Sequence, residues 1–110
     1  MAETFKNFNF MATATKSDAY TATTGVATTI VGFQASNMTT NSTGVLNVWL
    51  YDASAGSEIM IYNSITCPAA SAIGLKPDGD RWILEPGDII RVQATAANVV
   101  RIFGSIVEVS

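Results

Sequence analysis

Six carboxylates are the residues of this sequence whose chemistry most readily supports catalysis: Asp52, Glu58, Asp78, Asp80, Glu85 and Asp88. A glycosidase needs two such groups facing each other about 5–10 Å apart. Almost all of the six fall among glycine, proline and serine residues, where an aspartate usually accepts hydrogen bonds from its own turn. Asp78-Gly79-Asp80 offers oxygens that suit calcium, but it is far shorter than a full calcium-binding loop. We therefore interpret these residues as turn residues and expect neither an enzyme nor a metal or cofactor site.

Histidine is absent from the sequence, and Cys67 is its only cysteine. The Ser-His-Asp and Cys-His nucleophilic systems both need an imidazole base, so neither can be assembled here. Zinc sites of the usual kinds need several histidines or cysteines, and a disulfide within the chain needs two cysteines. Without a base beside it, Cys67 is expected to be a small buried or loop residue.

Aromatic residues offer a second kind of chemistry, because a flat ring can stack on a sugar. Trp49 and Tyr51 lie two positions apart and therefore share one face of a predicted strand over 45–51. This pair is the best candidate platform for a carbohydrate-binding module. A position in the core or in a protein interface explains the same pair, and we favour the interface.

β-Branched residues are dense along the chain, and strand-like segments recur about every 8–12 residues between turn-forming residues. This pattern predicts an all-β fold, an antiparallel β-sandwich of about eight or nine strands with an extended N-terminal arm, either jelly-roll or immunoglobulin-like. Residues 1–15 are expected to form the N-terminal arm or a first strand, and residues 16–110 the β-sandwich domain. A helical element over 66–72 stays open. Later strands are expected over 19–23, 26–35, 45–51, 59–62, 73–75, 81–84, 89–95 and 99–109.

Charged residues make up only 14% of the chain, against about 25% in an ordinary soluble domain. A surface of Thr, Ser and Asn costs little to desolvate against a neighbouring protein. The net charge is −3 and the Lys and Arg residues are scattered, so nucleic-acid binding is not expected. No apolar run reaches the roughly 18–20 residues of a membrane span, and the N-terminus shows no signal-peptide pattern. We expect synthesis in a cytoplasm and no membrane association.

Several predicted strands are apolar on both faces, whereas one face of each strand in a two-sheet sandwich should meet water. Cover from another subunit explains such strands, and scattered apolar surface residues are the alternative explanation. We therefore expect a homo-oligomer or a larger assembly. The adjacent apolar pairs are Ile30 and Val31, Trp49 and Leu50, Ile83 and Leu84, Val99 and Val100, and Ile106 and Val107.

The C-terminal half contains the run Leu84-Glu85-Pro86-Gly87-Asp88-Ile89-Ile90-Arg91-Val92-Gln93-Ala94. This run resembles the L-x-PGD-x-I-x-V-x-A ending of small bacteriophage virion proteins. Two further features of those proteins precede it, a Thr-rich strand ending in Asn37 and an alternating strand over 45–52. Ile65-Thr66-Cys67-Pro68-Ala69 stands where they often carry a proline-containing loop. The resemblance extends over residues 20–109.

The resemblance implies a short β-sandwich component of a phage head or tail, without enzymatic activity. The leading hypothesis is a capsid decoration (cement) protein, a trimer that binds the major capsid protein or other subunits of the virion. A tail, neck or fibre-associated structural protein is the alternative in the same class, and a carbohydrate-binding module is the alternative from another class. Residues 4–14 fall outside the pattern, and Phe5, Phe8 and Phe10 are expected to anchor this segment on a partner as a docking arm.

Overall fold

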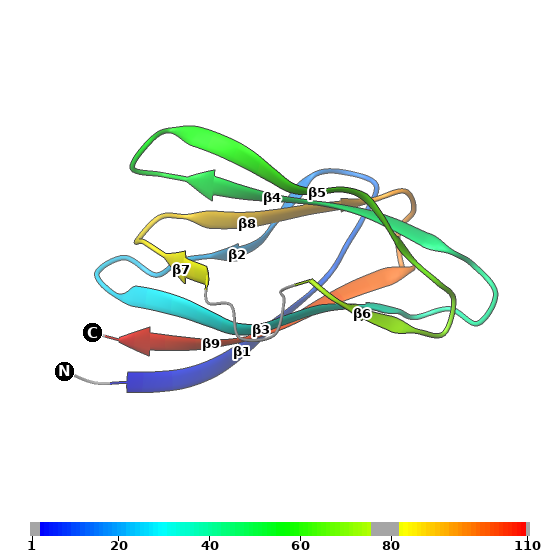
Figure 1. Cartoon of the computed structure of the whole chain (residues 1–110), viewed down its shortest axis with the longest axis horizontal. Coiled ribbons are helices and arrows are strands. Elements are labelled where there is room, and N and C mark those ends of the chain that lie inside the picture. Colours follow the sequence, from blue (N-terminus) through cyan, green and yellow to red (C-terminus); the bar gives the residue numbers. More distant parts are fainter. Residues whose placement is uncertain (1–2, 76–81, 110) are drawn as a thin grey trace.

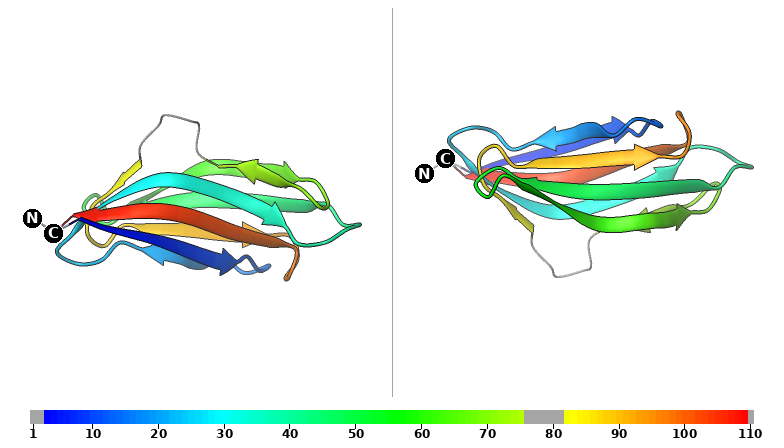
Figure 2. Two further views of the ribbon diagram at one scale, coloured as in Figure 1. Left: turned by 90° about the horizontal axis from the view of Figure 1, so that it is seen from below. Right: turned by 90° about the horizontal axis from the view of Figure 1, so that it is seen from above.

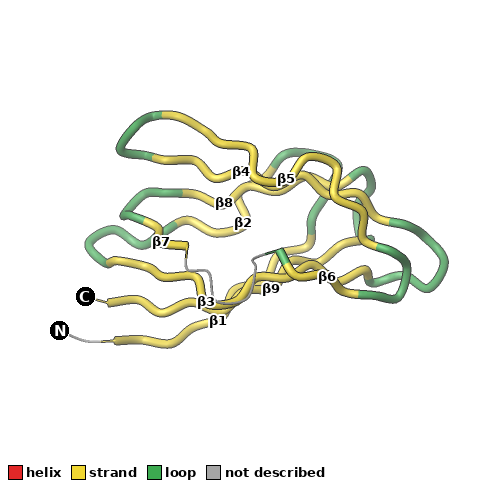
Figure 3. Tube along the Cα trace, in the orientation of Figure 1, coloured by secondary structure: helices red, strands yellow, loops and turns green. Residues whose placement is uncertain are grey.

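Nine β-strands make up the regular structure of the described part of the chain (Figure 1). The computed structural model describes residues 3–75 and 82–109, and within these ranges strands are joined only by turns and loops (Figure 3). No helix in this part of the chain is long and apolar enough to cross a membrane. The strands are β1 (Glu3–Met11), β2 (Ser17–Thr21), β3 (Ala27–Asn37), β4 (Gly44–Asp52), β5 (Ser57–Cys67), β6 (Ala72–Gly74), β7 (Trp82–Leu84), β8 (Ile89–Ala94) and β9 (Val100–Val109).

The strands form two antiparallel sheets that pack face to face (Figures 1 and 2). The first sheet has the order β1-β9-β3-β6, and β7 also pairs with β3, so β6 and β7 together occupy one strand position. The second sheet has the order β2-β8-β4-β5. The chain crosses between the sheets after β1, β2, β3, β5, β7 and β8, which is the connectivity of a jelly roll. The predicted β-sandwich is thus confirmed, and the strand order selects the jelly roll over the immunoglobulin-like alternative.

The core lies between the two sheets and follows the alternation of side chains along the strands. In β9 the even-numbered residues from Val100 to Glu108 point inward and are buried, while the odd-numbered residues face outward. In β8 the inward positions are Ile90, Val92 and Ala94. Leu46 and Val48 of β4 and Ile30 of β3 complete the centre of the core, and all three are fully buried.

Residues 1–15 had two alternative interpretations, and the structure shows a first strand rather than a free arm. β1 pairs with β9 over its whole length, from Glu3 opposite Val109 to Met11 opposite Arg101. Phe8 belongs to the hydrophobic core and is only 8% exposed. β1 is therefore an integral edge strand of the first sheet rather than a free segment.

Two further segments refine the expected elements. The strand expected over 59–62 is longer, because β5 runs from Ser57 to Cys67 through irregular pairing with β4. The helical element left open over 66–72 is instead the end of β5, a turn and the start of β6. Between β7 and β8 the predicted Pro-Gly turn is present, with the N–H of Asp88 donating to the carbonyl of Glu85 at 3.0 Å and Gly87 at a φ of 90°.

Candidate functional site

A row of four side chains crosses the outer face of the first sheet, away from the core. The strand register places Phe5 opposite Val107, Val107 opposite Thr29, and Thr29 opposite Ile83. Residues directly opposite each other in a sheet project to the same face. The row therefore runs from β1 through β9 and β3 to β7, the four strands seen side by side in Figure 2 (left).

Large apolar side chains in and beside this row are exposed to solvent. Phe5 is 76% exposed and Ile83 is 67% exposed, and nearby Val31 and Phe103 are 50% and 41% exposed. Val31 lies two positions after Thr29 and so faces outward by alternation, and the register of β3 shifts beside it, between Ile30 and Gly32. We call this surface the outer patch and define it as Phe5, Thr29, Val31, Ile83, Phe103 and Val107.

The outer patch contains a shallow depression with a volume of about 270 Å³. Among the residues that the structure describes, Phe5, Thr29, Val31 and Val107 line it together with one charged residue, Glu3. Exposed apolar surface with so little charge suits contact with another protein better than contact with water. Three of the two-sided apolar pairs predicted from the sequence meet here, since Ile30, Leu84 and Ile106 are buried while Val31, Ile83 and Val107 face outward.

The three phenylalanines predicted as anchors lie in different environments. Phe5 is in the outer patch, whereas Phe8 points into the core, with its ring centroid 5.0 Å from that of Tyr20 and 5.9 Å from that of Phe33. Phe10 is partly buried against the same core. Alternation explains the difference, because residues 8 and 10 share the inner face of β1 and residue 5 lies on the outer face. Phe8 is thus a structural residue in this fold, and Phe5 is the one that a partner can reach.

Trp49 and Tyr51 lie together on the outer face of the second sheet, as the alternation of the strand predicted. Each ring is covered by a cation of the same chain: Lys16 Nζ lies 4.4 Å from the Trp49 ring centroid, and the Arg91 guanidinium carbon lies 4.9 Å from that of Tyr51. Glu58 forms ion pairs with both cations. These contacts occupy one face of each ring and tie the pair into a charged surface network.

Charges on the outer face of the second sheet neutralise one another. Arg91 binds Asp18 through Nε and Glu58 through Nη1, both at 2.8 Å. The Lys16 hydrogen bond, followed by that of Arg91, lowers the pKa of Glu58 below its ordinary value. The hydrogen bond from Arg91 to Asp18, followed by that to Glu58, raises the pKa of Arg91. The two outer faces of the sandwich therefore differ, since the first carries the outer patch and the second carries this network of ion pairs.

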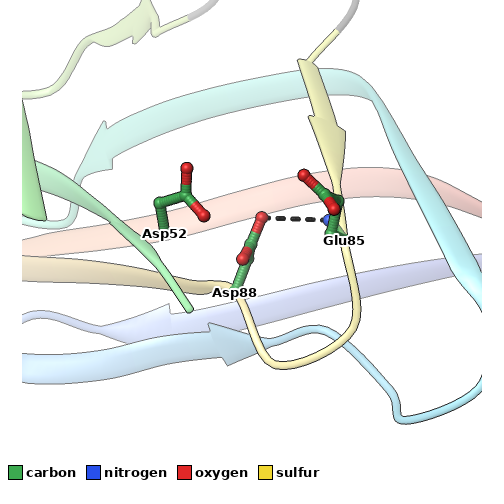
Figure 4. A group of neighbouring side chains, drawn as sticks. All are labelled: Asp52, Glu85 and Asp88. Carbon is green, nitrogen blue, oxygen red and sulfur yellow. Dashed lines mark hydrogen bonds between the residues drawn. The ribbon is translucent and has the colours of Figure 1, made fainter. Parts of the chain in front are cut away.

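Three of the six candidate carboxylates come together at one end of the sandwich (Figure 4). Oxygens of Asp52, Glu85 and Asp88 lie within 4.8 Å of one another. Asp88 is buried and accepts hydrogen bonds from the N–H groups of Ala53 (2.9 Å) and Glu85 (3.0 Å). Asp52 accepts hydrogen bonds from Ser54 and Ala55, and the Ser54 hydroxyl is the main cause of its lowered pKa. The turn role predicted for Asp52 and Asp88 is confirmed, while Asp78 and Asp80 lie outside the described residues.

Glu108 is a buried carboxylate that the sequence analysis did not single out. Its Oε1 lies 2.7 Å from Lys6 Nζ, and its Oε2 accepts hydrogen bonds from Thr23 (2.8 Å) and Tyr20 (3.3 Å). These contacts join β9 to β1 and to the second sheet. The hydrogen bond from Lys6, followed by that from Thr23, lowers the pKa of Glu108. The sequence signal was a charged residue at an inward position of an otherwise apolar alternating strand.

The stability that Glu108 contributes is expected to be lost in acid. Because its pKa in the fold is below the ordinary value of 4.5, the unfolded state binds more protons as the pH falls. The contribution is present above that value and disappears as the pH falls through the lower pKa of the folded state. Thermal unfolding should give wild type a higher melting temperature than Glu108→Gln at neutral pH. This difference in melting temperature should become smaller in acid. A gap independent of pH would contradict this account, and Glu85→Gln provides an exposed carboxylate as control.

No protein-family model matches the sequence, and no curated protein matches it. A solved chain described by "Bacillus endospore appendages form a novel family of disulfide-linked pili" is 13% identical, with a TM-score of 0.58 over 99% of this chain and 87% of that chain. Two structures of a pentameric capsid protein from metagenomic phage sequences are 17% and 19% identical, with TM-scores of 0.43 and 0.42. Each aligns with 91% of this chain, which spans 63% and 59% of theirs. At these identities the likeness concerns the fold alone.

Proposed function

We propose that this chain is a structural protein of a bacteriophage virion, a capsid decoration protein that stabilises the head by binding capsid subunits. The outer patch carries the proposal, because Phe5 and Ile83, at the two ends of one row across the first sheet, are large apolar side chains exposed on the same sheet face. Fully burying a side chain of this size contributes about 1.5–3 kcal/mol. Repeated over many copies on a particle, this burial raises the barrier to loss of capsid subunits.

The contrast between the two outer faces gives the proposed orientation on the particle. The face with the outer patch packs against the capsid, since it has little charge to desolvate. The face with Trp49 and Tyr51 stays in water, since its ion pairs with Lys16 and Arg91 are already satisfied there. This orientation differs from the sequence-based expectation that Trp49 and Tyr51 are themselves interface residues.

The same contacts weaken the carbohydrate-binding alternative. A sugar-stacking platform needs an open aromatic face, whereas Lys16 and Arg91 lie over the faces of Trp49 and Tyr51. The clustered carboxylates Asp52 and Asp88 accept hydrogen bonds from backbone N–H groups of the two turns that carry them, including one from Ala53 to Asp88 between the turns. A structural role is the function that the geometry supports best, and the resemblance of residues 84–94 to the endings of phage virion proteins supports the proposal that this role is in a virion.

The copy number of the protein in purified virions tests this function. A decoration protein covers the capsid lattice, so quantitative mass spectrometry should find it in numbers comparable to the major capsid protein. A tail, neck or fibre protein would be present in a few copies per particle, following the symmetry of the tail. Absence from purified virions would overturn the proposal altogether, and a low copy number would overturn its assignment to the capsid.

A further inference from the structure

The free edge of β1 is the longest regular sheet edge in the described part of the chain. At the opposite edge of the first sheet, β6 and β7 have only three residues each. In the second sheet, β2 has five residues with a register shift, and β5 has two register shifts and a Ser64 with a φ of 59°. β1 pairs with β9 through nine consecutive residues without any shift, and none of the other strands in residues 3–75 and 82–109 pairs with its other side.

The pairing register identifies which backbone groups of β1 face this free edge. The N–H of Ala12 donates to the carbonyl of Val100 at 2.9 Å, and this pair continues the β1–β9 register by one residue. In an antiparallel ladder, hydrogen-bonded pairs alternate with non-hydrogen-bonded pairs. The even-numbered residues of β1 therefore bond to β9, and the odd-numbered ones direct N–H and C=O groups outward, namely Glu3, Phe5, Asn7, Asn9 and Met11.

The devices that usually protect a sheet edge are weak on β1. The strand contains no proline and no bulge. Its one cation, Lys6, is an inward-pointing charge of the kind that protects sheet edges, but Glu108 compensates this charge, with Nζ 2.7 Å from Oε1. Of the residues whose backbone faces the edge, only Glu3 is charged. An exposed edge of this length with unbroken pairing on its other side is a template for another strand.

We propose that β1 pairs in antiparallel fashion with β1 of a second copy of this chain, with Asn7 facing Asn7 across a two-fold axis. This inference deepens the proposed function and rests on it for its biological setting. The register pairs odd-numbered residues with one another over all nine residues, and it sets Phe5 against Asn9 and Lys6 against Phe8. A register centred on Lys6 would instead place two like charges directly opposite each other. Five hydrogen-bonded pairs supply up to about ten backbone hydrogen bonds, the number found in a typical protein interface.

The two-fold pairing has a consequence for binding to a particle. An axis perpendicular to the sheet joins the two first sheets into one continuous sheet and keeps both outer patches on the same side. The dimer thus presents two patches to one capsid surface, and simultaneous binding strengthens attachment without any new kind of contact. A two-fold dimer replaces the trimer expected from the sequence resemblance.

Proline at position 7 tests the edge directly. The N–H of Asn7 faces the free edge, so Asn7→Pro removes no bond to β9, and proline is tolerated at such edge positions. Sedimentation equilibrium should give twice the monomer mass for wild type and for the matched control Asn7→Thr, and the monomer mass for Asn7→Pro. Circular dichroism should show the same strand content in all three proteins. A wild type that is a monomer or a trimer, or a folded Asn7→Pro that is still a dimer, would overturn the proposal.

Cysteine cross-linking tests the register. Asn7→Cys should form a disulfide-linked dimer under mild oxidation, because residue 7 faces itself at a separation that suits a disulfide. Phe5→Cys alone should not cross-link, whereas a mixture of Phe5→Cys and Asn9→Cys should; the wild type is the control, because Cys67 is buried. Cross-linking of Phe5→Cys but not Asn7→Cys would overturn this register. A wild type that is a monomer in solution yet binds particles would refute the edge contact and leave the proposed function standing, while a β1-paired dimer that never binds particles would do the reverse.

Discussion

Phe8→Ala is expected to lower the free energy of unfolding by about 3–5 kcal/mol, because it removes a buried ring at the centre of β1. The ring packs between Tyr20 and Phe33 and over Gly104, whose missing side chain makes room for it. Urea denaturation followed by tryptophan fluorescence measures the loss, and Phe5→Ala is the matched control on the outer face of the same strand. A loss near zero for Phe8→Ala would show that β1 is a detachable arm after all.

Gly104→Ala is expected to destabilise the contact between Phe8 on β1 and Gly104 on β9 by adding a methyl group to β9. A methyl group at Gly104 would overlap Cε1 and Cζ of Phe8 and would lie 3.1 Å from the carbonyl oxygen of Gly32. Overpacking of this kind costs about 1–3 kcal/mol. Gly74→Ala is the matched control, since a methyl group there meets nothing within 4 Å. If the two residues interact as described, Phe8→Leu should recover part of the stability lost in Gly104→Ala.

The second large effect is expected in particle binding. Ile83→Asp, alone or with Phe5→Asp, places carboxylates in the outer patch and should weaken binding to capsids that lack the protein by at least tenfold. The fold should be unaffected, since both side chains are largely exposed. Ile59→Asp is the matched control, because Ile59 is 55% exposed on β5 of the second sheet. Equal loss of binding in the control, or full binding by the double variant, would show that the outer patch is not the docking surface.

Most of the architecture could be predicted from local sequence patterns. Alternation identified β4 and β8, and the Pro86-Gly87 turn between β7 and β8 followed from the conformational preferences of its residues. The segment Phe5 to Phe10 was harder, because Asn7 and Asn9 are interspersed among the aromatics and an arm explained the pattern as well as a strand did. The irregular pairing of β5 around Ser64 has no clear sequence signal. The sequence-based prediction for this strand, residues 59–62, was therefore too short.

The candidate site could be predicted only in part. Two-sided apolar pairs such as Ile83 and Leu84 pointed to contacts with other chains, but the outer patch combines residues of β1, β3, β7 and β9. Only the register between strands far apart in the sequence shows that Phe5 and Ile83 belong to one surface. The same limitation applies to Trp49 and Tyr51, because the cations that cover them come from other segments of the chain.

A high-resolution electron cryo-microscopy reconstruction of the intact phage particle tests the central claim most directly. The account predicts copies of this protein on the head, with Phe5 and Ile83 buried against another protein chain and with Trp49 and Tyr51 facing solvent. Particles in which the outer face of the β1-β9-β3 sheet is bare, while the second sheet makes the contacts, would contradict it.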